Sequence, residues 1–128
     1  MFKQIKYSKL NSRQKENYNF HKVASKLADY GFNSMRLNDD WEGADFIAIN
    51  DKEMIKVQLK GRFSIDKKYL GKNLFIAFIE QDKVKIYLHD KAVNIAPNNI
   101  INSKSWKDNG LYNWSKTPKI YNKIITVL

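Results

Sequence analysis

Apolar residues recur at intervals of three and four in the first part of the chain. They are Phe20, Val23, Ala24 and Leu27. This spacing places them on one face of a helix, which predicts that the face is buried. Asn11 followed three residues later by Gln14 is typical of a capping box at a helix start, and Gly31 is typical of a helix stop. We therefore predict a helix from about Ser12 to Tyr30.

Five later segments carry the short apolar runs or the alternation that is typical of strands. They are Phe32 to Leu37, Ala44 to Ile49, Met54 to Lys60, Leu74 to Glu80 and Lys83 to Leu88. The second and third predict one hairpin, and the last two predict another about Gln81 and Asp82. The fold class expected is α/β (α+β), a central mixed β-sheet flanked by helices with a helix first.

The remaining segments are less regular. Asn38 to Gly43 predicts a polar, acidic loop between the first two strands. In Ser103 to Pro118, lysines alternate with three aromatic residues that either form a surface for nucleic acid or close the core. The aromatic residues are Trp106, Tyr112 and Trp114. The apolar residues Tyr121, Ile124 and Ile125 predict a closing helix or strand.

Composition narrows the class of protein. At 128 residues we expect a single domain, residues 1 to 128. Lys and Arg number 23 against 13 Asp and Glu, and the net charge of +10 favours a polyanionic partner, although the same charge also serves solubility. The chain has no cysteine for a disulfide or a thiolate metal site. No apolar run reaches the ~20 residues of a membrane span, so we expect a cytoplasmic protein with no membrane partner.

The residues with the strongest catalytic potential lie on the first predicted hairpin. Pairing of Ile49 with Met54 places Asp45 opposite Gln58, and alternation puts Lys56 and Lys60 on the same face. A carboxylate and an amide oxygen are hard ligands suited to Mg²⁺ or Mn²⁺, and a nearby ammonium can orient a water or neutralise an oxyanion. The alternative is structural, with Asp45 in a turn and the polar side chains on a solvated strand face.

The sequences Gly43-Ala44-Asp45 and Val57-Gln58-Leu59-Lys60 resemble the signature of the PD-(D/E)XK nuclease superfamily. Gln in place of the second acid is similar to the variant of certain homing endonucleases and small phage or bacterial nucleases. The resemblance covers roughly residues 12 to 61. It implies a restriction-endonuclease-like core and a Mg²⁺-dependent deoxyribonuclease. The superfamily normally has a helix between the Q-x-K strand and the next strand, for which residues 61 to 73 are short.

The resemblance also implies roles for single residues. Asp45 would be the principal metal ligand, Gln58 a second ligand, and Lys60 the group that orients the attacking water. The first helix of the superfamily often supplies an acid, and Glu16 lies four residues before Phe20, on the side of the apolar stripe. Glu16 is therefore an expected accessory metal ligand, or else a first-turn acid that interacts with the helix dipole.

Other charged residues are candidates for binding the substrate. Asp39, Asp40 or Glu42 would add a metal contact or form a turn. Five basic residues are expected to bind nucleic acid: Lys56, Arg62, Lys104, Lys107 and Lys116. DNA is the expected partner, the residues do not separate DNA from RNA, and cutting both strands of a duplex favours a homodimer.

Two rival functions fit the same residues. The first is a nuclease-like module that binds nucleic acid without cutting it, because Gln58 is a weaker metal ligand than an acid. The second is a protein-interaction module whose basic surface serves solubility. His21 and His89 are too isolated for a zinc site and are expected to be structural or surface residues.

Overall fold

The computed structural model describes all 128 residues, and its longest helix is α1 (Ser12–Ala28). The predicted capping box is present: the Asn11 side chain accepts from the Gln14 N–H, and the Gln14 side chain accepts from the Asn11 N–H, both at 2.9 Å. The helix ends two residues before the predicted Tyr30, and Gly31 follows with φ of +82°. None of the helices combines the length and the apolar composition needed to cross a membrane.

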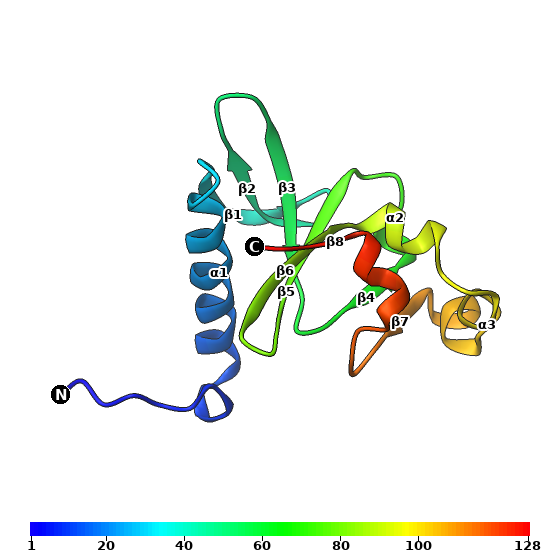
Figure 1. Ribbon diagram of the computed structural model, residues 1–128, viewed down its shortest axis with the longest axis horizontal. Coiled ribbons are helices and arrows are strands. Elements are labelled where there is room, and N and C mark those ends of the chain that lie inside the picture. The colour runs from blue at the N-terminus through cyan, green and yellow to red at the C-terminus, as the bar shows by residue number, and fades with distance from the viewer.

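A six-stranded sheet forms the centre of the molecule (Figure 1). Its strands are β1 (Asn33–Trp41), β2 (Ala44–Ile49), β3 (Met54–Leu59), β5 (Leu74–Glu80), β6 (Lys83–Leu88) and β8 (Ile125–Val127). The spatial order is β1-β2-β3-β5-β6-β8. Only β3 and β5 run parallel, so the sheet is mixed and the expected fold class is confirmed.

Both predicted hairpins form, with the predicted register next to their turns. In the first, Ile49 pairs with Met54 and Ile47 pairs with Lys56, but the ladder ends at Phe46 and Val57, so the expected pair of Asp45 and Gln58 is not part of it. In the second, Glu80 pairs with Lys83 across the turn at Gln81 and Asp82.

The acidic segment after the first strand is not the loop that the sequence predicted. Strand β1 continues to Trp41, which pairs with Ala44, so the turn consists of Glu42 and Gly43 alone. The pairing is irregular between Arg36 and Trp41. β1 is an edge strand with mostly exposed side chains, and its backbone pairs with β2 without needing apolar residues.

The connection between β3 and β5 contains no α-helix. Residues 61 to 73 instead form β4 (Ser64–Asp66) and the short 3₁₀ helix η2 (Lys67–Tyr69). β4 pairs with β7 (Leu111–Asn113) in a separate two-stranded sheet. This small sheet occupies the place that a crossover helix fills in the expected layout.

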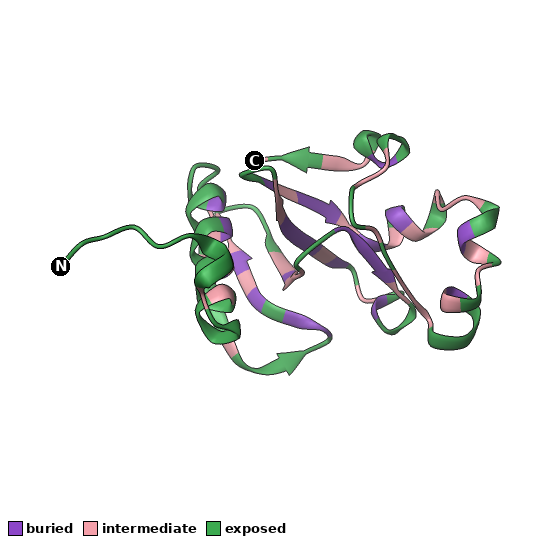
Figure 2. Ribbon diagram, turned by 90° about the horizontal axis from the view of Figure 1, so that it is seen from below, coloured by how far each residue is buried: buried purple, intermediate pink, exposed green.

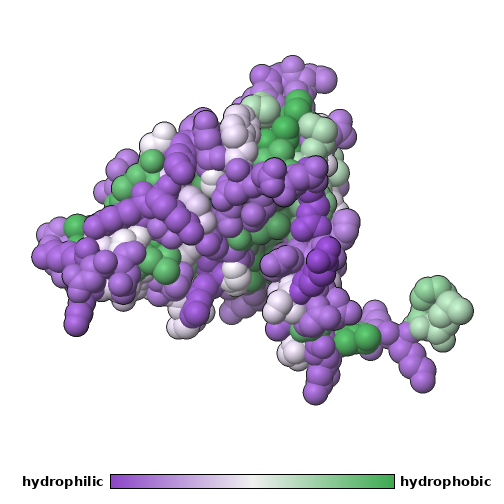
Figure 3. Space-filling view, turned by 180° about the vertical axis from the view of Figure 1, so that it is seen from behind, coloured by the Kyte–Doolittle hydropathy of each residue, from purple (hydrophilic) through white to green (hydrophobic).

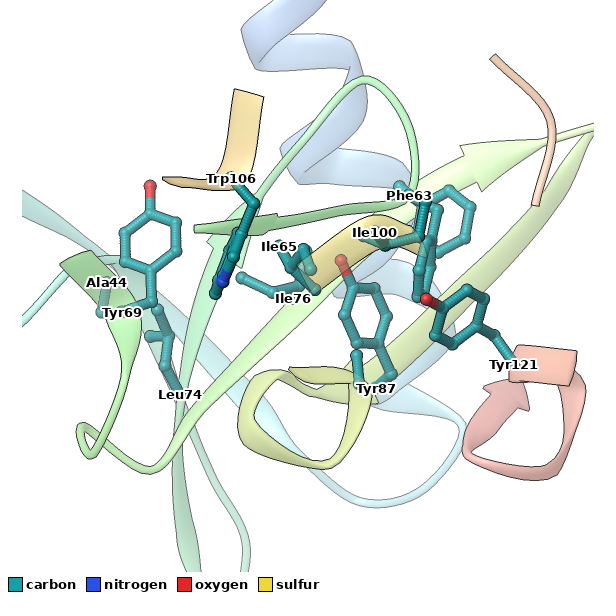
Figure 4. Packing of buried hydrophobic residues seen from close by; sticks show 12 residues of the cluster. Ala44, Phe63, Ile65, Tyr69, Leu74, Ile76, Tyr87, Ile100, Trp106 and Tyr121 are labelled. Atoms are coloured by element: carbon teal, nitrogen blue, oxygen red, sulfur yellow. The ribbon is translucent and has the colours of Figure 1, made fainter. Parts of the chain in front are cut away.

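Two apolar clusters lie on opposite faces of the central sheet, since Ala77 of one cluster lies between Ile76 and Phe78 of the other in β5. Figure 2 shows the buried positions along the central strands. On one face α1 contributes Phe20, Val23 and Leu27, which pack with Phe46 and Val57 of the sheet. On the other face the second cluster joins the sheet to the C-terminal part of the chain (Figure 4). That part contains α2 (His89–Asn94), α3 (Asn98–Ile101), the π-helix η3 (Ser105–Asn109) and the 3₁₀ helix η4 (Lys119–Lys123).

The aromatic residues of the C-terminal part close the core. Trp106 is buried, and Tyr112 and Trp114 are half-buried against the second cluster. The ring centroids of Trp114 and Phe63 are 5.2 Å apart, as are those of Trp114 and Tyr121. Of the two alternatives for these residues, core packing is therefore the one observed. Residues 119 to 127 form both the short helix η4 and the edge strand β8.

The surface is largely hydrophilic, and the N-terminal residues extend away from it (Figure 3). Met1 and Phe2 are fully exposed before the short 3₁₀ helix η1 (Tyr7–Lys9).

Candidate functional site

The candidate site lies where β2 and β3 separate. The paired positions of the two strands end at Phe46 and Val57. Just beyond this pair, the Leu59 N–H donates to Oδ2 of Asp45 at 2.9 Å. A carboxylate thus replaces the backbone carbonyl that would continue the ladder. This contact fixes Asp45 against the end of the strand that carries Gln58 and Lys60.

A pocket of about 400 Å³ opens at this point, with walls from α1, β1, β2 and β3. It is lined by the four residues expected to be catalytic, Glu16, Asp45, Gln58 and Lys60. Glu16 comes from the first turns of α1, and the other three come from the ends of the hairpin strands. The structure therefore brings the four side chains to one cavity, although they are up to 44 positions apart in the sequence.

Asp45 carries an unfavourable negative charge. Desolvation by the surrounding protein raises the pKa of its carboxyl group, and the charges of Asp40 and Glu16 raise it further. The hydrogen bond from Leu59 and the positive charge of Lys60 act in the opposite direction and lower this pKa. A cation in the pocket would relieve the repulsion among the three acids.

The amide of Gln58 is oriented by its own strand. Its NH₂ group donates a hydrogen bond to the Leu59 carbonyl at 3.3 Å, and its amide oxygen is left to accept from another group. That oxygen is an acceptor only, so it suits a cation or a water molecule.

Lys60 is held by its backbone and by an aromatic ring. Its N–H donates to the Ala77 carbonyl at 3.0 Å, which continues the parallel pairing of β3 and β5 beyond Leu59. Its Nζ lies 5.3 Å from the ring centroid of Tyr69. Tyr69 is buried and lies beside Ala44 in Figure 4, so the same ring supports both sides of the site.

The donor set of the pocket fits Mg²⁺ or Mn²⁺. Carboxylates and an amide oxygen are hard donors, and Mg²⁺ typically takes one or two protein carboxylates with water and phosphate in the other positions. The structure contains no group of three or more His, Cys, Asp or Glu side chains arranged to hold a metal ion. Asp45 with the Gln58 oxygen would therefore hold the ion, with Glu16 or Asp40 as an accessory acid.

Lys56 shares the strand face of Gln58 but does not line the pocket. Its Nζ donates to Oε2 of Glu42 at 2.5 Å and lies 5.4 Å from the ring centroid of Trp41. The hydrogen bond and charge of Lys56 lower the pKa of Glu42. Glu42 thus pairs with a lysine and does not join the acids of the pocket.

The other basic candidates lie outside the pocket. Arg62, Lys104, Lys107 and Lys116 are all exposed. The segment of α3 and η3, which includes Lys104 and Lys107, lies at the end of the molecule opposite α1 (Figure 1).

Asn19 and Arg36 are among the pocket residues that were not foreseen from the sequence. Asn19 lies one helical turn after Glu16, and Arg36 is the one basic residue of β1. Nη1 of Arg36 donates to Oδ1 of Asn17 at 2.6 Å, and the guanidinium lies 4.9 Å from the ring centroid of Phe20. The spacing of three from Glu16 was a signal for Asn19, whereas Arg36 required knowledge of the packing between α1 and β1.

Comparison with known proteins shows that the fold resembles that of one solved structure. The chain matches no family model, and no curated protein matches its sequence. A solved structure of a bacterial homing endonuclease, I-Ssp6803I, superposes with a TM-score of 0.52 at 12% sequence identity. The match covers 85% of this chain and 78% of the endonuclease chain. The protein therefore has a nuclease-like α+β fold built on a mixed central sheet.

Proposed function

We propose that the protein is a divalent-metal-dependent endonuclease that hydrolyses phosphodiester bonds of DNA. The observation that carries this proposal is the shared pocket of Glu16, Asp45, Gln58 and Lys60 at the point where β2 and β3 separate. The likeness to a homing endonuclease supports it at the level of fold. The net charge of +10 supports a polyanionic substrate.

Each residue of the pocket has a task in this reaction. Asp45 and the Gln58 oxygen would hold the ion, and Glu16 would assist. Bound Mg²⁺ supplies positive charge against the developing negative charge of the phosphoryl group and makes a water more acidic. Lys60 orients the attacking water or stabilises the charge that develops on the phosphoryl oxygens. Arg62, just beyond β3, holds an adjacent phosphate.

Cleavage assays with matched variants test the proposal. Supercoiled, linear, branched and single-stranded DNA are incubated with Mg²⁺ or Mn²⁺ and with wild type, Asp45→Ala or Lys60→Ala. We expect each variant to lose at least about a hundredfold in rate, because a positioned catalytic group contributes about that much. Circular dichroism checks that the variants are folded.

The β2–β3 turn offers the matched controls. Asp51 and Lys52 are exposed residues of the same types, at the end of the hairpin away from the pocket. Asp51→Ala and Lys52→Ala are expected to cut as wild type does. Equal cutting by wild type, Asp45→Ala and Lys60→Ala would identify the activity as a contaminant and remove the proposed site.

A second candidate function is a nuclease-like module that binds DNA without cutting it. The absence of a group of three acidic, imidazole or thiolate ligands favours it, as does an amide at position 58. It predicts salt-dependent DNA binding, no cleavage with either metal, and no change in that binding for Lys60→Ala.

We also propose that the active form is a homodimer, because two sites are needed to cut both strands of a duplex in one encounter. Sedimentation velocity with and without a short duplex tests this point. A monomer in both conditions would contradict it.

A further inference from the structure

A second cavity, of about 270 Å³, adjoins the candidate active site. Asn19, Lys60 and Gly61 line both cavities, so the two share a wall at the end of β3. The remaining walls come from η1, α1 and the β5–β6 turn, which lies beside the first turns of α1 in Figure 1.

Two tyrosines form an aromatic wall of this second cavity. The rings of Tyr7 and Tyr18 are edge-to-face with centroids 5.1 Å apart, and both side chains are partly exposed. The Tyr7 hydroxyl donates to Oδ1 of Asn19 at 3.1 Å, which leaves the Asn19 NH₂ group as a donor. Lys15 and Lys22 lie 5.4 Å and 5.3 Å from the centroids of these rings. The wall therefore combines aromatic surface with an amide donor, Lys60 adds a positive charge to the lining, and Lys15 and Lys22 add positive charge beside the tyrosine rings outside the lining.

A further wall is the two-residue turn between β5 and β6. Gln81 and Asp82 have φ of +52° and +61°, the left-handed conformation that a tight turn between antiparallel strands requires at both central residues. Both residues line the cavity, together with Ile79. An amide and a carboxylate therefore line the same cavity as the two tyrosines.

We infer that this second cavity binds one unstacked nucleobase next to the phosphate held in the candidate active site. Aromatic side chains provide stacking surface for a base, and lysines beside them neutralise the flanking phosphates. The carboxylate of Asp82 accepts from an exocyclic amino group, and the Asn19 and Gln81 amides bind the other groups on the base edge.

The inference deepens the proposed function and rests on it, because it places the base beside the reacting phosphate. A base that is paired and stacked in a duplex cannot enter a side cavity without being extruded. The preferred substrate class is therefore DNA with an unpaired nucleotide beside the cut, such as a bulge, flap or frayed end. Asp82 favours bases that carry an amino group, so cytosine is the probe of choice.

Equilibrium binding in EDTA tests the inference without any cleavage. Three fluorescently labelled DNAs are compared at one salt concentration: a perfect duplex, the same duplex with one unpaired cytosine, and the same duplex with an abasic site at that position. We expect wild type to bind the DNA with the unpaired cytosine about tenfold more tightly than the abasic DNA. Stacking of one base on an aromatic ring contributes about this much to affinity.

Tyrosine variants assign the effect to the cavity. Tyr18→Ala is expected to bind the unpaired and abasic DNAs equally, whereas Tyr18→Phe keeps the preference because it keeps the aromatic face. Tyr30 is the matched control, since it is also an exposed tyrosine, two residues beyond the C-terminal end of α1 and outside the cavity. Tyr30→Ala is expected to keep the full preference.

Equal affinity of wild type for the unpaired and abasic DNAs would overturn the inference, as would equal losses in Tyr18→Ala and Tyr30→Ala. A further variant, Asp82→Asn, is expected to reduce the preference for unpaired cytosine over unpaired thymine, and an unchanged preference would remove Asp82 from the subsite. Asp45→Ala is expected to keep the preference for the unpaired base. If wild type does not cleave DNA but keeps this preference, the proposed function is refuted and the inference of a base-binding cavity is still supported.

Discussion

At the scale of single residues, the negative charge of Asp45 in the candidate site lowers the stability of the folded protein. Asp45 is partly open to solvent, but the protein around it desolvates its carboxyl group, and this desolvation is the first cause of its raised pKa. The negative charges of Asp40 and Glu16 raise this pKa further, so the charged form of Asp45 is unfavourable in the folded protein. Sites of this kind often show a trade between stability and activity.

Asp45→Asn should therefore stabilise the protein while it abolishes cleavage. The folded state holds the Asp45 proton to a higher pH than the unfolded chain, so the charged form costs stability at neutral pH. Asn keeps an acceptor for the Leu59 N–H and removes the charge. Because the side chain is partly open to solvent, we expect a gain below about 1 kcal/mol.

Thermal unfolding at several pH values measures this gain. It should be full at neutral pH, shrink as the pH falls through the folded-state pKa, and vanish below the ordinary aspartate value of 3.8. A variant that is less stable than wild type at neutral pH would contradict the electrostatic account.

His89 is the second titratable residue with a consequence for stability. It is fully buried, its Nε2 accepts from the Asp66 N–H at 3.0 Å, and its Nδ1 lies 3.2 Å from Oδ1 of Asp90. Burial lowers the pKa of His89 from its ordinary 6.5, against the opposing effect of Asp90. The expectation of a structural histidine agrees with this position.

The lowered pKa predicts acid sensitivity. As the pH falls below 6.5 the unfolded chain binds a proton before the folded state does, so stability is lost with decreasing pH by up to about 1.4 kcal/mol per pH unit. His89→Gln should flatten this slope, measured by urea unfolding between neutral and mildly acidic pH. His21→Gln, at an exposed position of α1, should keep the slope, and equal slopes for wild type and His89→Gln would contradict the assignment.

At the scale of elements, the β1–β2 turn fixes the position of Asp45. Gly43 has φ of +85°, and a Cβ at this position would lie 2.9 Å from Cδ1 of Tyr69. The turn is thus held against the ring that also contacts Lys60. One side chain added here would disturb both sides of the pocket.

Gly43→Ala should destabilise the protein by more than about 1 kcal/mol, because the left-handed conformation alone costs alanine about that much. The clash with Tyr69 adds to this cost. Gly61→Ala is the control, since a Cβ there meets no atom within 4 Å and φ is not in the left-handed region. Urea unfolding of the two variants measures the difference, and equal stabilities would show that the turn and Tyr69 adapt freely.

The hairpin elements could be predicted from sequence because their cause is local. Strand side chains alternate with a period of two, so a turn of given length fixes which residues share a face. The acidic part of β1 could not be predicted in this way, since its polar residues pair at a sheet edge through the backbone alone. The pairing of β4 with β7 could not be predicted from local patterns either, because the paired residues are more than 40 positions apart in the sequence.

At the scale of the whole molecule, the net charge of +10 predicts that the proposed binding of DNA is sensitive to salt. Each phosphate that a protein neutralises adds about 0.9 to the slope of log affinity against log salt. Replacing Lys104, Lys107 and Lys116 together by Gln should therefore make the slope shallower by about 0.9 for each phosphate that these lysines bind. Fluorescence anisotropy over a salt series measures the slope, and an unchanged slope would remove these lysines from the interface.

Much of the candidate site could be proposed from the sequence. The shared face of Asp45, Gln58 and Lys60 followed from strand register, Glu16 from the helical stripe together with the family resemblance, and Asp40 from the acidic segment before Gly43. The contribution of Arg36 depends on how β1 packs against α1, which no local pattern encodes. The second cavity joins residues 7 and 82, so it exists only in the folded chain.

The exposed strand β1 has a further consequence for assembly. A free sheet edge offers unpaired N–H and C=O groups to any other strand, and natural proteins often guard such edges with charge. Asp39 and Asp40 place negative charge on this edge and disfavour pairing with another strand. A second subunit is therefore expected to dock at a different surface. The same acids repel the sugar-phosphate backbone. If the proposed function holds, a DNA substrate should therefore approach over the flank formed by Lys60 and Arg62.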